Sequence, residues 1–161
     1  MSEAPGWEPF RQGLARQLAE LHDGGFVVLT VPSRSRDAVG RRSALFGLIP
    51  PKIESVAPFV QLLRSEETLR AECIGPTSLG GRFPYTAAEQ EQMPGLGWHA
   101  TVADGMGGPV WVHFFPDDVP TAPYLPRELA DAAAALAVTT LREVFGCVTP
   151  DLVEPTTQRD G

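Results

Sequence analysis

The sequence contains one lysine, two cysteines and three histidines among its 161 residues, and these shortages exclude several classes of protein. Cys73 and Cys147 cannot form the disulfide framework of a small secreted domain, and they lack metal-ligand spacing, so we expect two buried, reduced thiols. No apolar run approaches the roughly 20 residues that cross a bilayer, and the N-terminal segment has no apolar stretch of signal length. These features predict a cytoplasmic protein that makes no contact with a membrane.

Basic charge is also scarce over a long part of the chain. The net charge is −7, from 13 basic and 20 acidic residues, and no lysine or arginine occurs between Arg82 and Arg127. A surface built from this part would repel phosphate, so nucleic acid is not an expected ligand, whereas a basic partner is. Arginines cluster instead in the segment 33–55, where acidic residues are interspersed, as is typical of a solvated loop.

The sequence lacks the spaced motifs that carry catalysis or hold a cofactor. No H-E-x-x-H pattern or Cys/His spacing is present, so we predict no metal, no cofactor and no catalytic residue. Ser78 does not have the spacing of a hydrolase nucleophile, and the glycines at 105–108 precede a strand rather than the helix N-terminus that binds phosphate. A small enzyme with a cleft near His99, Asp104 and His113 is kept as a third hypothesis.

Glycine and proline are abundant, with 16 of each, and most of them separate the expected elements. Apolar residues spaced three and four apart predict a first helix from about Phe10 to Leu21. Apolar and β-branched runs predict strands at 26–31, 56–63, 69–74, near 99 and at 110–115.

Two further helices follow from local signals. Thr86 and Glu89 form a capping box that starts a short helix, which Pro94 is expected to end near Met93. The longest helix is expected over 126–145, and its apolar surface is wider than one stripe.

These elements follow one another in the order α-β-β-β-α-β-β-α. We expect a single domain over residues 1–161, with an ordered core at about 8–148. The connection 33–55 is longer than compact domains usually use, and the tail 149–161 is polar, so both are expected to be mobile.

Several short sequences, together with the element order, make residues 8–153 similar to a known superfamily. They are Phe-Val-Gln-Leu at 59–62, Leu-Arg-Ala-Glu at 69–72, the capped segment 86–91, Leu-Gly-Trp at 96–98, Trp111 and Leu-Arg-Glu-Val-Phe-Gly at 141–146. The chain resembles the actinobacterial branch of the superfamily that unites type III secretion chaperones with YbjN-like proteins. It departs from the family pattern at Gly75-Pro76, where an asparagine is expected, and at Pro94, which shortens the second helix.

The resemblance implies the α+β class, with an antiparallel sheet and helices packed on one side, as in a type III secretion chaperone. It also implies a homodimer that holds an extended segment of a client protein. The leading hypothesis is therefore a non-enzymatic, chaperone-like protein-binding domain. The alternative is a YbjN-like regulator, or an antitoxin-like binder, that recognises one folded basic partner through the acidic stretch 83–126.

Candidate partner-binding residues come from the predicted hairpin and the last helix. Trp98 and Trp111 are expected to lie close together across the hairpin, either as a core pair or as an aromatic patch for a partner. Apolar area left over on the last helix would serve self-association or client contact. The candidates are Trp98, Trp111, Phe115, Leu136, Leu141, Phe145 and Glu72.

Overall fold

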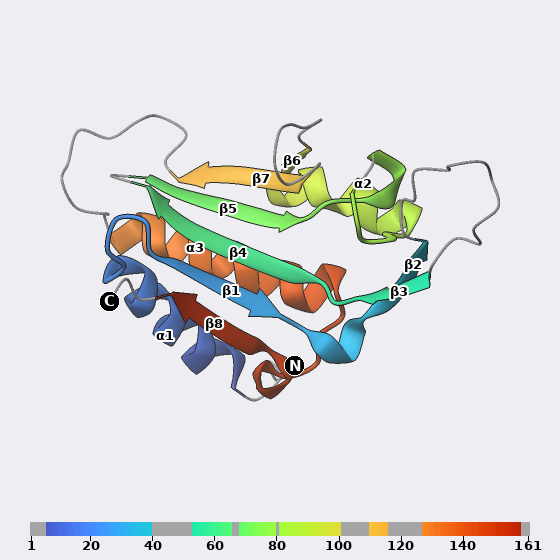
Figure 1. Ribbon diagram of the computed structural model, residues 1–161. Helices are drawn as coiled ribbons and strands as arrows, with labels where there is room; N and C mark the ends of the chain where they lie inside the picture. Colours follow the sequence, from blue (N-terminus) through green and yellow to red (C-terminus); the bar gives the residue numbers. More distant parts are fainter. Residues whose placement is uncertain are drawn as a thin grey trace.

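The computed structural model describes residues 6–39, 53–65, 68–79, 81–100, 110–115 and 127–158. The strands are β1 (Phe26–Thr30), β2 (Arg36–Val39), β3 (Ile53–Val56), β4 (Phe59–Ser65), β5 (Thr68–Ile74), β6 (His99–Ala100), β7 (Val110–Phe115) and β8 (Glu154–Gln158). Within these residues, six strands form an antiparallel sheet in the order β6-β7-β5-β4-β1-β8, and β2 pairs with β3 in a separate ribbon (Figure 1).

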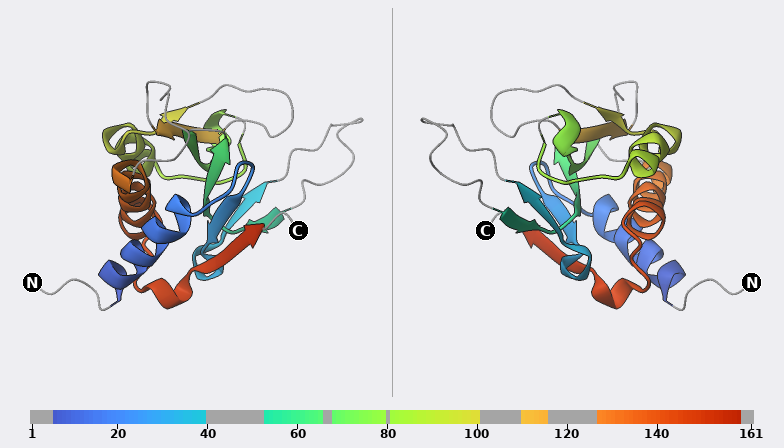
Figure 2. Two further views of the ribbon diagram at one scale, coloured as in Figure 1. Left: turned by 90° about the vertical axis from the view of Figure 1, so that its left-hand side faces the viewer. Right: turned by 90° about the vertical axis from the view of Figure 1, so that its right-hand side faces the viewer.

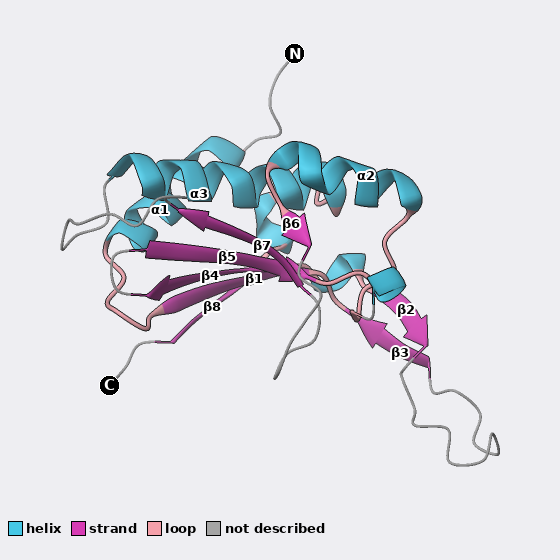
Figure 3. Cartoon of the chain, turned by 90° about the horizontal axis from the view of Figure 1, so that it is seen from above, coloured by secondary structure: helices cyan, strands magenta, loops and turns pink. Residues whose placement is uncertain are grey.

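Helices cover one face of this sheet. The α-helices are α1 (Trp7–Ala19), α2 (Ala87–Leu96) and α3 (Arg127–Thr139), and 3-10 turns occur at Pro32–Arg34, Thr77–Leu79 and Pro150–Leu152. Figures 2 and 3 show α1, α2 and α3 on the same side of the strands. The chain therefore has the expected α+β fold, with an antiparallel sheet and helices packed on one side.

The core lies between the sheet and the helices α1 and α3. Alternate residues of the central strands point into it, such as Val27 and Leu29 of β1, which are at most 1% exposed. The spacing predicted for the first helix is confirmed, because Leu14 and Leu18 are buried on one side of α1. Alanines on the buried side of α3 allow α1 to approach closely; they are Ala130, Ala133, Ala134 and Ala137.

The second helix runs past the proline that was expected to end it. The capping box at Thr86 and Glu89 is confirmed, but α2 continues through Pro94 to Leu96 and ends at Gly97, where φ is 106°. Pro94 is exposed and lies in the last turn, where it removes one backbone donor from the helix. Gly97 supplies the left-handed conformation that ends the helix.

The last helix changes its hydrogen-bonding pattern before it ends. The expected helix over 126–145 is α-helical only to Thr139, and a π-helical turn, Thr140–Val144, follows it. The backbone N–H of Phe145 donates to the carbonyl oxygen of Thr140 at 3.1 Å, a π-type bond. The change begins at Thr140, the last of three consecutive β-branched residues that start at Val138. β-Branched side chains are restricted at χ1 and have a lower helix propensity than unbranched ones.

The connection expected to be a mobile loop holds ordered structure at both ends. Residues 33–55 contain β2 and the start of β3, which pair antiparallel from Arg36↔Val56 to Val39↔Ile53. The arginines here are not merely solvated, because Arg34 Nε donates to the Phe145 carbonyl oxygen at 2.8 Å and Arg36 forms an ion pair with Glu89. Long-range partners of this kind leave no trace in local composition.

Part of the tail 149–161, which we expect to be mobile, forms a strand. Residues 154–158 form β8, which pairs with the whole of β1 from Thr30↔Glu154 to Phe26↔Gln158. Regular secondary structure therefore continues beyond residue 148. The tail lacks an apolar pattern, and the backbone of β1 supplies its pairing partners, so the strand could not be recognised locally. Pro155 is tolerated because β8 is an edge strand.

Candidate functional site

Most of the candidate partner-binding residues lie in the core. Trp98, Trp111, Phe115, Leu141 and Phe145 are at most 7% exposed, so they present no apolar surface to a partner in this structure. The expected surplus of apolar area on the last helix is covered because α3 packs on both the sheet and α1. Leu136 is half-buried against the core, and Glu72 is half-buried on β5, where it forms an ion pair with Arg70 at 2.8 Å.

The two tryptophans contact different neighbours. Nε1 of Trp98 donates to Oγ1 of Thr140 at 3.0 Å, and that hydroxyl donates to the Leu136 carbonyl oxygen at 2.8 Å. Trp111 packs edge-on against Tyr85, with ring centroids 6.4 Å apart, and its Nε1 has no hydrogen-bond partner among the described residues. Of the two interpretations made from the sequence, the structure favours a core role for each, although through separate contacts.

The buried polar groups near these rings are held neutral. The Tyr85 hydroxyl donates to the Ile74 carbonyl oxygen at 2.5 Å and lies 3.4 Å from Sγ of Cys73. Burial raises the pKa of the Cys73 thiol to about 12, and burial likewise raises the pKa of Tyr85. Cys73 and Cys147 are both free and buried, as expected. A thiol in this state is a poor nucleophile, because the thiolate is the reactive form.

An ion pair fastens the β2–β3 ribbon to α2. Arg36 donates from both terminal nitrogens to the Glu89 carboxylate, at 2.6 and 2.7 Å, and its guanidinium lies 4.9 Å from the Phe83 ring centroid. Burial by itself raises the pKa of Glu89, but hydrogen bonds from Arg36 and Thr86 outweigh it and hold that pKa below its ordinary value. Both groups therefore stay ionised at neutral pH, and the negative charge of Glu89 is balanced by Arg36 within the chain.

Two of the three residues named for an enzyme cleft lie together. The rings of His99 and His113 are stacked with centroids 6.1 Å apart, and Nδ1 of His113 lies 2.6 Å from the Gly97 carbonyl oxygen. Asp104 lies outside the described residues. Across the described part of the chain, no three His, Cys, Asp or Glu side chains are grouped as metal ligands.

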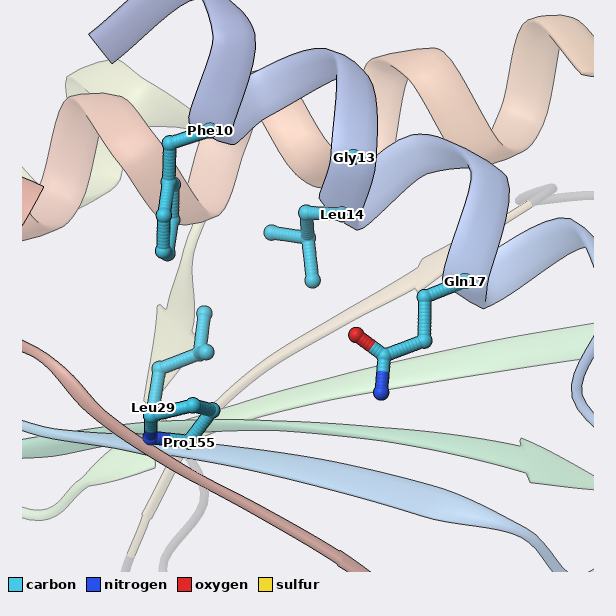
Figure 4. Close-up of a pocket in the computed structure, with 6 residues that line it drawn as sticks. All are labelled: Phe10, Gly13, Leu14, Gln17, Leu29 and Pro155. Carbon is cyan, nitrogen blue, oxygen red and sulfur yellow. The ribbon is translucent and has the colours of Figure 1, made fainter. Parts of the chain in front are cut away.

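An apolar pocket of about 330 Å³ lies between α1 and the edge of the sheet. Figure 4 shows Phe10, Leu14 and Gln17 pointing from α1 towards the strands, with Leu29 of β1 and Pro155 of β8 opposite them. Leu14 and Leu29 form its buried floor, whereas Gln17 and Pro155 are exposed at its rim. Its size is in the range of sites that bind ligands, and it would accommodate a leucine or phenylalanine side chain.

Gly13 contributes to the opening of this pocket. It lines the pocket from α1, and a Cβ atom added at this position would meet no heavy atom within 4 Å. The sequence does not reveal the pocket, because its residues come from three elements far apart in the chain. The one local signal was Gly13, a glycine within an otherwise good helix, which carries a cost that packing or function usually explains.

The face of the sheet without helices carries a second apolar area. The register places Phe26 and Val28 of β1 beside Leu63 and Gln61 of β4, on the side opposite Val27 and Leu29. Phe26, Val28, Phe59 and Leu63 are half-buried there, and Phe114 of β7 is 46% exposed. We call this group the helix-free face.

The chain matches a known family model. A family model described as TY-Chap3, "T3SS (YopN, CesT) and YbjN peptide-binding chaperone 3", matches residues 2–159 of the chain. Neither the curated proteins nor the solved structures include a match to this chain. Among the described residues, no helix is sufficiently long and apolar to cross a membrane.

Proposed function

The chain belongs to the TY-Chap3 family of peptide-binding chaperones, and on this premise we propose that it binds an extended segment of a client protein without catalysing a reaction. The observation that carries the proposal is the apolar pocket between α1, β1 and β8. An extended peptide offers side chains at alternate positions, so one apolar side chain can enter a pocket while the backbone follows a strand. Leu14 and Leu29 would contact that side chain, and Gly13 keeps the entrance open.

The test uses a variant that fills the pocket without weakening the helix. Gly13→Leu adds a side chain where the structure has open space, and leucine has a higher helix propensity than glycine. We expect it to weaken binding about tenfold for a fluorescent eight-residue peptide in which leucine alternates with threonine. Fluorescence anisotropy with the full-length chain measures the dissociation constants.

Gly13→Ala is the matched control, because it improves the helix but leaves most of the pocket empty. It should bind the peptide as the unaltered chain does, and the same peptide with serine for leucine should bind weakly to all three proteins. If the unaltered chain does not distinguish the two peptides, or if Gly13→Leu binds as well as Gly13→Ala, the pocket is not the client site.

We also propose a homodimer, formed through the helix-free face rather than the last helix. Phe114 is the exposed apolar residue of this face, and the Arg70–Glu72 ion pair lies beside it, with the Arg70 guanidinium 5.8 Å from the Phe114 ring centroid. Adjacent opposite charges suit a two-fold contact, because each can face its opposite in a second copy.

The cytoplasm is the proposed location, supported by two unpaired cysteines.

The dimer proposal predicts that Phe114→Glu sediments as a monomer in analytical ultracentrifugation, whereas the unaltered chain sediments as a dimer. A charge placed in an apolar contact without a partner strongly disfavours association. Val148→Glu is the matched control, since Val148 is also apolar and 67% exposed but lies outside the helix-free face. A monomeric unaltered chain would contradict the proposal.

The alternative function, binding of a folded basic partner, has less support. Glu89 belongs to the acidic stretch but is neutralised by Arg36, and Asp104, Asp117 and Asp118 lie outside the described residues. Binding through an exposed acidic surface weakens as salt is added, whereas filling of an apolar pocket does not. Salt dependence of client binding therefore separates the two functions.

A further inference from the structure

The strand β8 is attached to the sheet almost entirely through its backbone. Residues 154–157 are exposed, and the nearest buried side chain is Val153, which precedes the strand. Its partner β1 is paired along its whole length, from Phe26 to Thr30. A segment with few buried apolar contacts belongs to the part of a protein that opens most easily.

Beneath β8, the space available for a side chain is not filled. Pro155 pairs with Leu29, and both residues line the 330 Å³ pocket under α1. The proline ring remains exposed at the rim and does not fill the space above Leu14 and Leu29. A longer apolar side chain at the position of Pro155 would reach further into the pocket and bury more apolar surface.

The outer edge of β8 is a poor site for another strand. A proline within the ladder must direct its nitrogen away from its partner strand, because it has no N–H to donate. Pro155 is the second residue of β8, so the outward edge lacks a donor there. Prolines at such edges discourage further pairing. The edge of β1, whose residues Phe26–Thr30 include no proline, is the better template.

We propose that β8 is a displaceable occupant of the β1 edge, and that an extended client segment with a large apolar residue opposite Leu29 takes its place. This inference rests on the proposed function and specifies how the client reaches the same pocket. The client backbone would pair with β1 as Glu154–Gln158 does, and its apolar side chain would enter between Phe10, Leu14 and Leu29.

Displacement of a tethered strand makes binding selective. β8 competes from within the same chain at an effective concentration on the order of millimolar, as is typical of short flexible links. A client segment that merely copies its backbone pairing gains nothing over β8. Only a segment that fills the pocket better than Pro155 is favoured, so the tail excludes polar peptides.

The test locks β8 in place within the full-length chain. Val28 and Thr156 are directly opposite in the register and, unlike Leu29 and Pro155, do not line the pocket. Opposed residues of a hydrogen-bonded pair have Cα atoms about 5.5 Å apart, a spacing that a disulfide spans. The double variant Val28→Cys, Thr156→Cys can therefore be measured with the disulfide closed and, after reduction, open.

The probe is a fluorescent peptide of residues 152–159 carrying Pro155→Leu. We expect it to bind the oxidised variant at least tenfold more weakly than the reduced variant, and to bind the unaltered chain equally with and without reductant. The same peptide with the native proline should bind at least tenfold more weakly than the Pro155→Leu peptide.

Equal binding to the oxidised and reduced variants would overturn the displacement of β8. If Gly13→Leu still weakened binding in that case, the proposed function would stand, with the client entering beside an unmoved β8. If no peptide bound the unaltered chain, the proposed function itself would fail and this inference with it. Closure of the disulfide is verified by the absence of reactive thiols at the two new cysteines.

Discussion

Replacing Trp98 with alanine is expected to lower the free energy of unfolding by about 3–5 kcal/mol, the usual cost of removing a large buried side chain. Trp98 is 1% exposed, and its Nε1 donates to Thr140 Oγ1 inside the core. The side chain therefore connects the segment after α2 with the π-helical turn that follows α3. Urea unfolding followed by circular dichroism measures the loss, as a shift of the midpoint at constant slope.

Two milder variants separate the contributions of volume and hydrogen bonding. Trp98→Phe keeps most of the apolar volume, whereas Thr140→Val keeps the tryptophan but leaves its buried N–H unpaired, at an expected cost of about 1–3 kcal/mol. Peptide binding should be unchanged in both. An aromatic patch for a partner predicts the opposite result, a small loss of stability and a large loss of binding, and that outcome would contradict the core role.

The second large effect is expected at Gly81. A Cβ atom there would lie 2.3 Å from the backbone carbon of Gly75 and 2.4 Å from its oxygen. Hydrogen bonds join the two main-chain segments: the N–H groups of Arg82 and Phe83 donate to the Gly75 carbonyl oxygen at 3.0 and 2.9 Å. The segments cannot move apart to admit the methyl group without breaking these hydrogen bonds. Gly81→Ala should therefore destabilise the chain by about 3 kcal/mol, at the upper end of the range for overpacking.

Gly13→Ala provides the matched control for this substitution. The same methyl group is added, but at Gly13 it meets no atom within 4 Å and lies within a helix, so we expect a gain of up to about 1 kcal/mol. Thermal and urea unfolding of the two variants should differ in sign. Equal effects would mean that backbone entropy, rather than the close approach of Gly75 and Gly81, dominates at both sites.

Local patterns predicted the elements that carry strong local signals. The apolar spacing of α1, the strand predicted at 69–74 and the capping box of α2 depend on neighbouring residues, and each is confirmed. The fold class followed from the order of these elements and from the resemblance to a family. The family model that matches residues 2–159 confirms that resemblance.

Elements whose stability comes from distant partners could not be predicted in this way. β8 has no apolar pattern and exists because β1 offers an unpaired edge, and β2 pairs with β3 across the undescribed residues 40–52. Pro94 was expected to end α2, but the helix continues through it to Leu96. A proline removes a backbone hydrogen-bond donor, and the effect of that loss depends on the position of the proline in the helix.

The candidate site depended most strongly on tertiary structure. Composition identified large apolar residues, but not which of them would be covered, and Trp98, Trp111 and Phe145 became core. The pocket requires α1, β1 and β8 to meet, so its residues share no sequence motif. The scarcity of cysteine and the missing catalytic spacings could be read directly from the sequence, and they made a disulfide-rich domain and a motif-bearing enzyme unexpected. The position of an exposed apolar surface is a property of packing, and it emerges only when every element has been placed.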